Sequence, residues 1–272
     1  MTIHEDGIGV IRVGGLGNQI FQVCSAFIVS KYNNCPLYIT DIQESDNPHN
    51  KFKNNYKKTI FKYFNSENEE IINSYRVINH GVHNCFNKWD PHTIKKGSIM
   101  NHYGQYYPNL EPFRSEICDL LLKGLKELRD EIKLKNNITE DSIFIHIRRG
   151  DYVEASHKHY LQPIEYYNKA YNYIKELNPI KNVYILSDDI EWVKGQSFFQ
   201  NIPNRVFWEN DDELNAIALM SLCTGGAICA NSTFSWWGAF LGAYSTHSPV
   251  IVPQRWISTG IVDLFPKEWI IF

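Results

Sequence analysis

The second half of the chain alternates short, continuously apolar segments with longer segments whose apolar residues recur at helical spacing. Short apolar strands that alternate with helices are typical of parallel sheets whose two faces are both covered. We therefore predict an α/β fold for this half. The predicted strands are 142–147, 182–187, 204–208, 226–230 and 249–253, and the predicted helices are 163–177, 212–223 and 232–244.

The first half begins with the same alternation and then loses it. Residues 7–13 and 36–40 are apolar segments typical of strands, and residues 17–32 between them show helical spacing. We therefore predict a strand, a helix and a second strand at the start of the chain. Residues 41–101 are polar and weakly periodic, and we expect loops and short helices there.

A long amphipathic helix is predicted over residues 111–133, followed by polar residues 133–141 that are the best candidate for a linker. The apolar stripe of this helix consists of Ile117, Leu121, Leu125 and Leu128. Each half of the chain is long enough to bury its own core. We therefore predict an N-terminal domain over residues 1–135 and a C-terminal domain over residues 136–272.

Composition and charge narrow the class of protein. The 272 residues are 43% hydrophobic and 21% charged, which is ordinary for a soluble globular protein. The formal net charge of −3 disfavours a general nucleic-acid binder, which needs many cations against phosphate. We therefore expect no nucleic-acid partner.

Cysteine usage and the lack of long apolar runs indicate the compartment. None of the six cysteines forms a C-x-x-C pair or lies at a spacing typical of a zinc site, so we expect reduced thiols. The sequence shows no apolar core of a signal peptide near its start and no apolar run of the roughly 20 residues that span a bilayer. We predict a cytoplasmic protein without a transmembrane segment, and peripheral contact with a membrane is left open.

Polar clusters follow three of the predicted strands. They are HIRRGDY at 146–152, SDD at 187–189 and NSTFS at 231–235. In open parallel sheets, ligands bind outside the carboxyl ends of the strands. We therefore expect these three clusters to meet at one edge of the C-terminal sheet.

The arginines of the first cluster indicate a phosphate ligand. His146 and Arg148 share one side of their strand, and Arg149 and Asp151 belong to the turn beyond it. Arginine offers a planar set of donors that matches phosphate and keeps its charge, so two arginines can neutralise a pyrophosphate without a metal. The structural alternative is an ion pair of Arg148 or Arg149 with Asp151 that only holds the turn.

The other clusters carry weaker signals. Asn231 or Ser232 can cap the following helix, whose N-terminus then attracts an anion, although an ordinary cap explains the same residues. Asp188 and Asp189 suit hydrogen bonds to a ribose or a base, and a Mg²⁺ site is the lesser alternative. The glycine turn GGLGNQIFQ at 14–22 matches neither dinucleotide nor P-loop motifs, but it allows a ligand to approach its backbone.

Four motifs in this order resemble one enzyme family. GGLGNQIFQ, HIRRGDY, NSTFSWWGAFLG and DLFPKEWI together resemble the alpha-1,2-fucosyltransferases of bacteria and animals over nearly the whole chain. Residues 41–101 are the least typical part. The H-x-R-R-x-D core also resembles that of alpha-1,6- and protein O-fucosyltransferases, whereas GGLGNQ with NSTFSWWG narrows the resemblance to the alpha-1,2 group.

The resemblance implies a GT-B architecture, in which two Rossmann-like α/β domains with parallel sheets face each other across a cleft. The N-terminal domain would face the acceptor and the C-terminal domain would bind the GDP-sugar. It implies an inverting transfer of L-fucose from GDP-beta-L-fucose to the 2-hydroxyl of a galactose-terminated oligosaccharide. No cofactor and no metal would take part.

The resemblance also implies roles for single residues. Arg148 and Arg149 would stabilise the departing GDP, with His146 and Asp151 orienting them or touching the nucleotide. Asp188 and Asp189 would lie near the ribose or guanine, Asn231, Ser232 and Thr233 would face the phosphates or the fucose, and Gly17, Asn18 and Gln19 would close the cleft from the other domain. The candidates for the general base are Asp151, Glu154, His157 and His159, with Asn18 orienting the acceptor hydroxyl.

Two alternatives stay open at this point. One is a fucosyltransferase of another linkage, or a transferase that uses another GDP-sugar. The other is a non-catalytic protein that binds a GDP-sugar or a glycan on the same scaffold.

Overall fold

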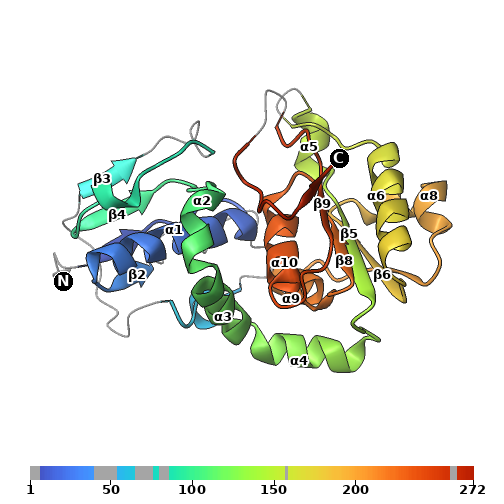
Figure 1. Ribbon diagram of the computed structural model, residues 1–272, viewed down its shortest axis with the longest axis horizontal. Coiled ribbons are helices and arrows are strands. Elements are labelled where there is room, and N and C mark those ends of the chain that lie inside the picture. Colours follow the sequence, from blue (N-terminus) through green and yellow to red (C-terminus); the bar gives the residue numbers. More distant parts are fainter. Residues whose placement is uncertain (1–6, 40–53, 65–75, 80–85, 157–158, 258–261) are drawn as a thin grey trace. The chain divides into compact units, whose positions relative to one another are not determined.

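A computed structural model describes residues 7–39, 54–64, 76–79, 86–156, 159–257 and 262–272 (Figure 1). The chain divides into two compact units. The first comprises Met1–Leu125 with Asp263–Pro266, and the second comprises Lys126–Val262 with Lys267–Phe272. We predicted the boundary after residue 135, in the linker, whereas this division assigns helix α4 (Lys126–Lys135) to the second unit.

The first unit contains a parallel four-stranded sheet in the order β2-β1-β4-β3. The strands are β1 (Ile8–Val10), β2 (Leu37–Ile39), β3 (Arg76–Asn79) and β4 (Ser98–Asn101). Helix α1 (Leu16–Asn33) joins β1 to β2, as the apolar spacing predicted. Residues 19–30 of this helix are all buried, and the helix ends where Asn34 takes a left-handed conformation with φ 47°.

Two predictions for this unit were wrong. The polar stretch 41–101 contributes strands β3 and β4, and β4 lies inside the sheet between β1 and β3. The helix predicted over 111–133 is divided into a 3-10 turn η4 (Glu111–Phe113), α3 (Arg114–Gly124) and α4. It breaks after Gly124, where an added Cβ would lie 2.7 Å from the carbonyl oxygen of Thr59, so the packed backbone leaves room only for glycine. The shorter elements are α2 (Tyr107–Leu110), η1 (Tyr56–Lys58) and η3 (Pro91–Thr93).

The second unit contains a parallel six-stranded sheet in the order β10-β9-β8-β5-β6-β7. The strands are β5 (Ser142–Ile147), β6 (Asn182–Ser187), β7 (Arg205–Phe207), β8 (Gly226–Ile228), β9 (Val250–Val252) and β10 (Ile270–Ile271). The helices that follow α4 are α5 (Gly150–Glu154), α6 (Ile164–Leu177), α7 (Ile190–Lys194), α8 (Ser197–Gln200), α9 (Glu213–Leu222) and α10 (Thr233–Ala243). The predicted parallel sheet with its five strands and three helices is confirmed.

The strand order of this sheet reverses between β5 and β8. From β5 the chain adds β6 and β7 on one side, and then returns to add β8, β9 and β10 on the other side. A crevice for ligands forms at such a switch point, outside the carboxyl ends of the strands. The HIRRGDY segment leaves β5 and the NSTFS segment leaves β8, so the topology places both at this point.

Alternation along β5 decides which side chains face which layer. Ile143, Ile145 and Ile147 pack into the core beneath α6. His146 points to the opposite face, where its ring contacts that of Phe234 on α10 at 5.8 Å between centroids. Among the described residues, no helix is long and apolar enough to cross a membrane.

Candidate active site

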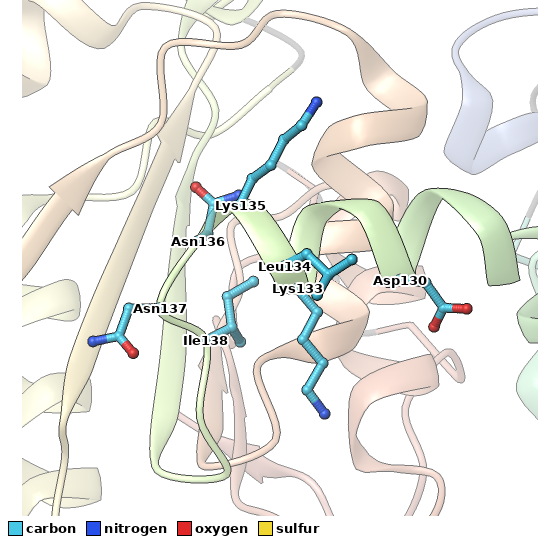
Figure 2. A pocket seen from close by; sticks show the side chains of 7 residues that line it. All are labelled: Asp130, Lys133, Leu134, Lys135, Asn136, Asn137 and Ile138. Carbon is cyan, nitrogen blue, oxygen red and sulfur yellow. The ribbon is translucent and has the colours of Figure 1, made fainter.

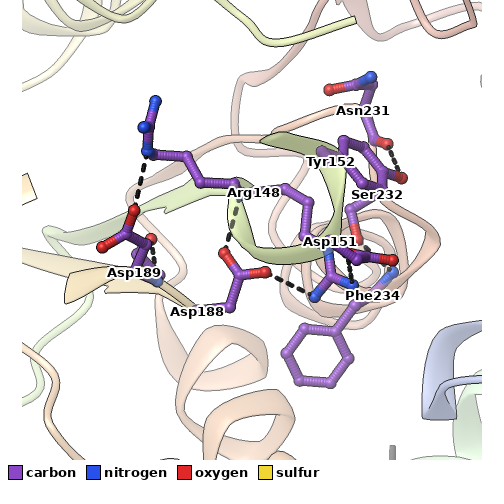
Figure 3. Close-up of polar contacts among 10 residues, drawn as sticks. Arg148, Asp151, Tyr152, Asp188, Asp189, Asn231, Ser232 and Phe234 are labelled. Atoms are coloured by element: carbon purple, nitrogen blue, oxygen red, sulfur yellow. Dashed lines mark hydrogen bonds and ion pairs between the residues drawn. The ribbon is translucent and has the colours of Figure 1, made fainter. Parts of the chain in front are cut away.

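Arg148 lies just beyond the end of β5 and is held by two carboxylates (Figure 3). Its Nη2 lies 2.6 Å from Oδ1 of Asp151, and its Nη1 lies 2.9 Å from Oδ2 of Asp188. Its guanidinium carbon also lies 5.3 Å from the centre of the Tyr152 ring. The guanidinium plane is therefore fixed between the first turn of α5 and the end of β6.

Arg149 points to a different set of partners. Its Nε lies 3.1 Å from Oδ2 of Asp189, and its guanidinium carbon lies 3.6 Å from the centre of the Trp192 ring on α7. Its backbone N–H donates to Oδ1 of Asp188 at 2.8 Å. The two neighbouring arginines are thus positioned by separate elements, and Asp188 connects them.

The carboxylates of the SDD segment serve the arginines in this structure. Asp188 and Asp189 each pair with one arginine, and Asp189 also caps α7 by accepting from the backbone N–H of Trp192 at 3.3 Å. Two arginines therefore face three carboxylates when Asp151 is included. The carboxylates engage Nη1 and Nη2 of Arg148 and Nε of Arg149, and because each guanidinium has five N–H donors, further donors remain for an anionic ligand.

Gly150 makes this arrangement compact. An added Cβ at this position would lie 2.4 Å from Oδ2 of Asp188, the atom that pairs with Arg148. A side chain between the arginines and Asp151 would therefore displace the Asp188 carboxylate from its contact with Arg148.

His146 is buried beside Arg148 and is uncharged at neutral pH. Burial, together with the charge of Arg148, lowers the pKa of His146 to about 3. Its Nδ1 is buried and has no hydrogen-bond partner within the described part of the chain. His146 thus adds no cation to the site, and its predicted contact with the nucleotide stays a prediction.

The NST segment forms the start of α10. Ser232 is the N-cap, and its Oγ accepts from the backbone N–H of Phe234 at 3.3 Å. Nδ2 of Asn231 donates to the carbonyl oxygens of Tyr160 and Trp256, so this side chain ties three loops together. Thr233 is the first helical residue. The positive end of the α10 dipole therefore lies at the same sheet edge as the arginines.

Tyr152 and His159, which follow the arginines in the chain, form a stacked pair of rings. Their rings stack at 4.2 Å with an angle of 11° between the planes. Burial raises the pKa of Tyr152 to about 12, so its hydroxyl keeps its proton, and it donates to the carbonyl oxygen of Asn231 at 3.1 Å. Tyr152 therefore connects α5 to the segment that begins α10.

The glycine turn of the first unit is held by glutamines of its own helix. Nε2 of Gln19 donates to the carbonyl oxygen of Gly14 at 2.9 Å, and Oε1 of Gln19 accepts from buried Arg12. Oε1 of Gln22 accepts from the backbone N–H of Val13. The Gln19 side chain is thus engaged within the turn, while Gly17 is the second residue of the helix.

The structure brings most of the predicted site together. Within the second unit, the carboxyl edge carries His146, Arg148, Arg149, Asp151, Asp188, Asp189, Asn231, Ser232 and Thr233, with Glu154 and His159 close by in sequence. Gly17, Asn18 and Gln19 belong to the first unit, and His157 lies outside the described residues. Sequence reasoning assigned no role to Tyr152 of the HIRRGDY segment and did not find Trp192, because their contacts with the arginines become apparent only in three dimensions.

A hollow of about 790 Å³ lies elsewhere in the second unit, where α4 ends (Figure 2). It is lined by Asp130, Lys133, Leu134, Lys135, Asn136, Asn137 and Ile138. These residues precede the amino end of β5, whereas the arginines follow its carboxyl end. The hollow is therefore separate from the candidate site.

Comparison with known sequences identifies the family. The profile of Glycosyl transferase family 11 matches residues 7–271. The chain belongs to glycosyl transferase family 11. This match confirms the resemblance that the four motifs indicated, and membership of this family makes the protein a glycosyltransferase.

Among relatives of this family 11 glycosyltransferase, the O-antigen biosynthesis glycosyltransferase WbnK of Escherichia coli is 28% identical, over 90% of this chain and 93% of WbnK. An alpha-1,2-colitosyltransferase of Escherichia coli is 35% identical, over 53% of this chain and 50% of that protein. A galactoside 2-alpha-L-fucosyltransferase of Caenorhabditis elegans is 29% identical, over 61% of this chain and 51% of that protein.

Solved structures support the fold of the family 11 chain. The fucosyltransferase NodZ from Bradyrhizobium matches with a TM-score of 0.52 and 12% identity, over 87% of this chain and 93% of NodZ. FUT1 of Arabidopsis thaliana, in complex with GDP, matches with a TM-score of 0.50 and 14% identity, over 91% of this chain and 70% of FUT1. The predicted GT-B-like α/β class with parallel sheets is thereby confirmed.

Proposed function

We propose that the protein transfers L-fucose from GDP-beta-L-fucose to the 2-hydroxyl of a terminal beta-galactoside, with inversion to an alpha linkage. The motif combination GGLGNQ with NSTFSWWG supports the linkage. The names of the Caenorhabditis elegans and Escherichia coli relatives are consistent with a 6-deoxy sugar carried to a 2-hydroxyl. A NodZ structure soaked with GDP-fucose supports the choice of donor.

The observation that carries this proposal is the placement of Arg148 and Arg149 at the switch point, next to the N-terminus of α10. In the reaction, the acceptor oxygen forms a bond to the anomeric carbon while the bond from that carbon to the β-phosphate oxygen breaks. Negative charge then grows on the β-phosphate of the departing GDP. Fixed donors and a helix N-terminus aimed at that charge stabilise the transition state.

The carboxylates give the arginines a defined geometry before the donor binds. Asp188 holds the backbone of Arg149 and the side chain of Arg148 at once. A pyrophosphate that replaces Asp151 on Nη2 of Arg148 would find the guanidinium already oriented, because Asp188 still holds Nη1. Preorganised donors of this kind need no rearrangement at the moment of bond cleavage.

The proton of the acceptor hydroxyl must pass to a base. We propose Asp151 and His159 as candidates for this general base, with Glu154 and His157 as further candidates. Asp151 contacts Arg148, so its carboxylate lies next to the proposed phosphate site. His159 stacks on Tyr152, which fixes the plane of its ring. Asn18 has a carboxamide that takes up no proton, so its proposed role is to orient the hydroxyl.

The proposal is tested by GDP release from GDP-fucose, measured with and without lactose or N-acetyllactosamine. We expect GDP release that depends on the acceptor, and an alpha-linked fucose on the galactose 2-hydroxyl by NMR of the product. Fucose attached to N-acetylglucosamine would contradict the proposed acceptor site. Binding of GDP-fucose without any transfer would instead favour a non-catalytic protein that binds a GDP-sugar.

A second donor is favoured by one observation, the 35% identity to an alpha-1,2-colitosyltransferase. Colitose is the 3-deoxy analogue of L-fucose, so the same leaving group and the same arginines would serve either sugar. Comparing kcat/KM for GDP-fucose and GDP-colitose with one acceptor decides between them. A clear preference for GDP-colitose would replace fucose in the proposed reaction and leave its chemistry unchanged.

Transfer should persist in excess EDTA. The two arginines and the start of α10 supply the positive charge that a divalent ion provides in other transferases. Initial rates in EDTA, in Mg²⁺ and in Mn²⁺ should therefore agree. Loss of activity in EDTA that Mg²⁺ or Mn²⁺ restores would assign Asp188 and Asp189 to a metal site instead.

A further inference from the structure

Gln105 contacts Asn18 from inside the first unit. Nε2 of Gln105 donates to Oδ1 of Asn18 at 2.9 Å, although the two residues are 87 positions apart. Gln105 is 4% exposed, so its amide is shielded from competing water. With Nε2 as the donor, Gln105 pairs with the oxygen end of the Asn18 amide.

The segment that carries Gln105 is anchored to the same helix as Asn18. Oγ of Ser25, two turns after Asn18 on α1, donates to the carbonyl oxygen of Gly104 at 3.2 Å. Gly104 has φ +59°, and an added Cβ would lie 2.1 Å from that Oγ, so only glycine permits this approach. Gln105 is therefore placed against α1 by its own neighbour rather than by the contact with Asn18.

The other end of the Asn18 amide is located as well. A Cβ built at Gly14, where φ is +79°, would lie 3.1 Å from Nδ2 of Asn18. The glycine turn thus accommodates the amide nitrogen, while Gln105 binds the amide oxygen. Rotating the amide by 180° would place its nitrogen against Nε2 of Gln105, so the hydrogen bond is kept only if the Gln105 amide turns as well.

We propose that Gln105 is a positioning residue for transfer, which fixes the orientation of the Asn18 amide and thereby the way Asn18 holds the acceptor hydroxyl. This inference rests on the proposed function, in which Asn18 orients that hydroxyl. A hydroxyl held by one orientation of an amide loses its hydrogen bond in the other, because donor and acceptor exchange places. Gln105 touches neither donor sugar nor acceptor in this proposal.

Two near-isosteric variants separate positioning from packing. Gln105→Met fills the space without a hydrogen bond, so the Asn18 oxygen loses the contact with Nε2 and kcat should fall about 3- to 10-fold. Gln105→Glu places a carboxylate, which only accepts, against Oδ1 of Asn18. The amide should then turn over, and kcat should fall on the order of 100-fold.

The measurement is kcat and KM for transfer to lactose, with the affinity for GDP and the melting temperature recorded for each variant. We expect both variants to bind GDP within about twofold of the unaltered protein, because the residues proposed to bind GDP belong to the second unit and Gln105 to the first. Gln200→Glu is the matched control for the added charge, since Gln200 bonds to Arg205 and to the carbonyl oxygen of Lys194. It should leave kcat unchanged.

The outcomes are distinct. A graded loss of kcat, larger for Gln105→Glu than for Gln105→Met and without loss of GDP affinity, supports the inference. If both variants turn over as fast per folded molecule as the unaltered protein and only their melting temperatures fall, the inference is overturned and Gln105 has a packing role. An unaltered protein that binds GDP but transfers no sugar overturns the proposed function, and with it the role of Asn18.

Discussion

Replacing Arg148 with lysine should leave a folded protein that binds GDP more weakly and turns over at least about 100-fold more slowly. Lysine keeps the positive charge but has a single nitrogen, so it cannot bridge two oxygens in one plane as the guanidinium does. In this structure the guanidinium bridges Asp151 and Asp188 with Nη2 and Nη1. Because this contact strengthens as charge grows on the β-phosphate, its loss should lower kcat and not only raise KM.

The Arg148→Lys experiment needs steady-state kinetics, GDP titration and thermal unfolding on the same preparation. Arg205→Lys is a matched control, because Arg205 makes its hydrogen bonds to Gln200 and to the carbonyl oxygen of Ile202. We expect the control to keep its turnover. Near-normal kcat in a well-folded Arg148→Lys protein would remove Arg148 from the mechanism and leave Arg149 as the main candidate.

The second unit was predictable because each of its main elements follows a simple rule. Strands such as β5 and β6 are short apolar runs, and β8 and β9 each follow a helix that is apolar on nearly all sides. The two-residue strand β10 was missed because so short a strand has no pattern of its own. In the first unit, β4 is four residues inside a polar stretch, and only its pairing with β1 and β3 defines it.

The position of the site was predictable, but its internal contacts were not. The carboxyl-end rule places Arg148 and the SDD segment at one edge from sequence alone. That Asp188 would contact both arginines depends on the register of β5 with β6, in which Ile147 pairs with Ser187. The pairing of Gln105 with Asn18 depends on the contact of Gly104 with Ser25. Because Asn18 and Gln105 lie in different parts of the chain, far apart in sequence, no local spacing indicates the pairing.

A double variant tests whether the two arginines act on one charge. Arg149→Lys should reduce kcat on the order of 100-fold, because lysine has no planar group to stack on Trp192 at 3.6 Å and no Nε to pair with Asp189. The comparison uses four proteins: unaltered, Arg148→Lys, Arg149→Lys and the double variant. For each protein, kcat, GDP affinity and melting temperature are measured under the same conditions.

If both arginines grip the same pyrophosphate, their losses will not multiply. Once one lysine lets the β-phosphate shift, the remaining arginine is no longer aligned with it, so removing that arginine costs less than before. We expect the double variant to lose no more than about 1,000-fold in kcat, whereas independent effects would give about 10,000-fold. A full product of the two losses would contradict a shared phosphate. A normal kcat in Arg149→Lys would show that Arg149, held by Asp189 and Trp192, serves only to fix the turn after β5.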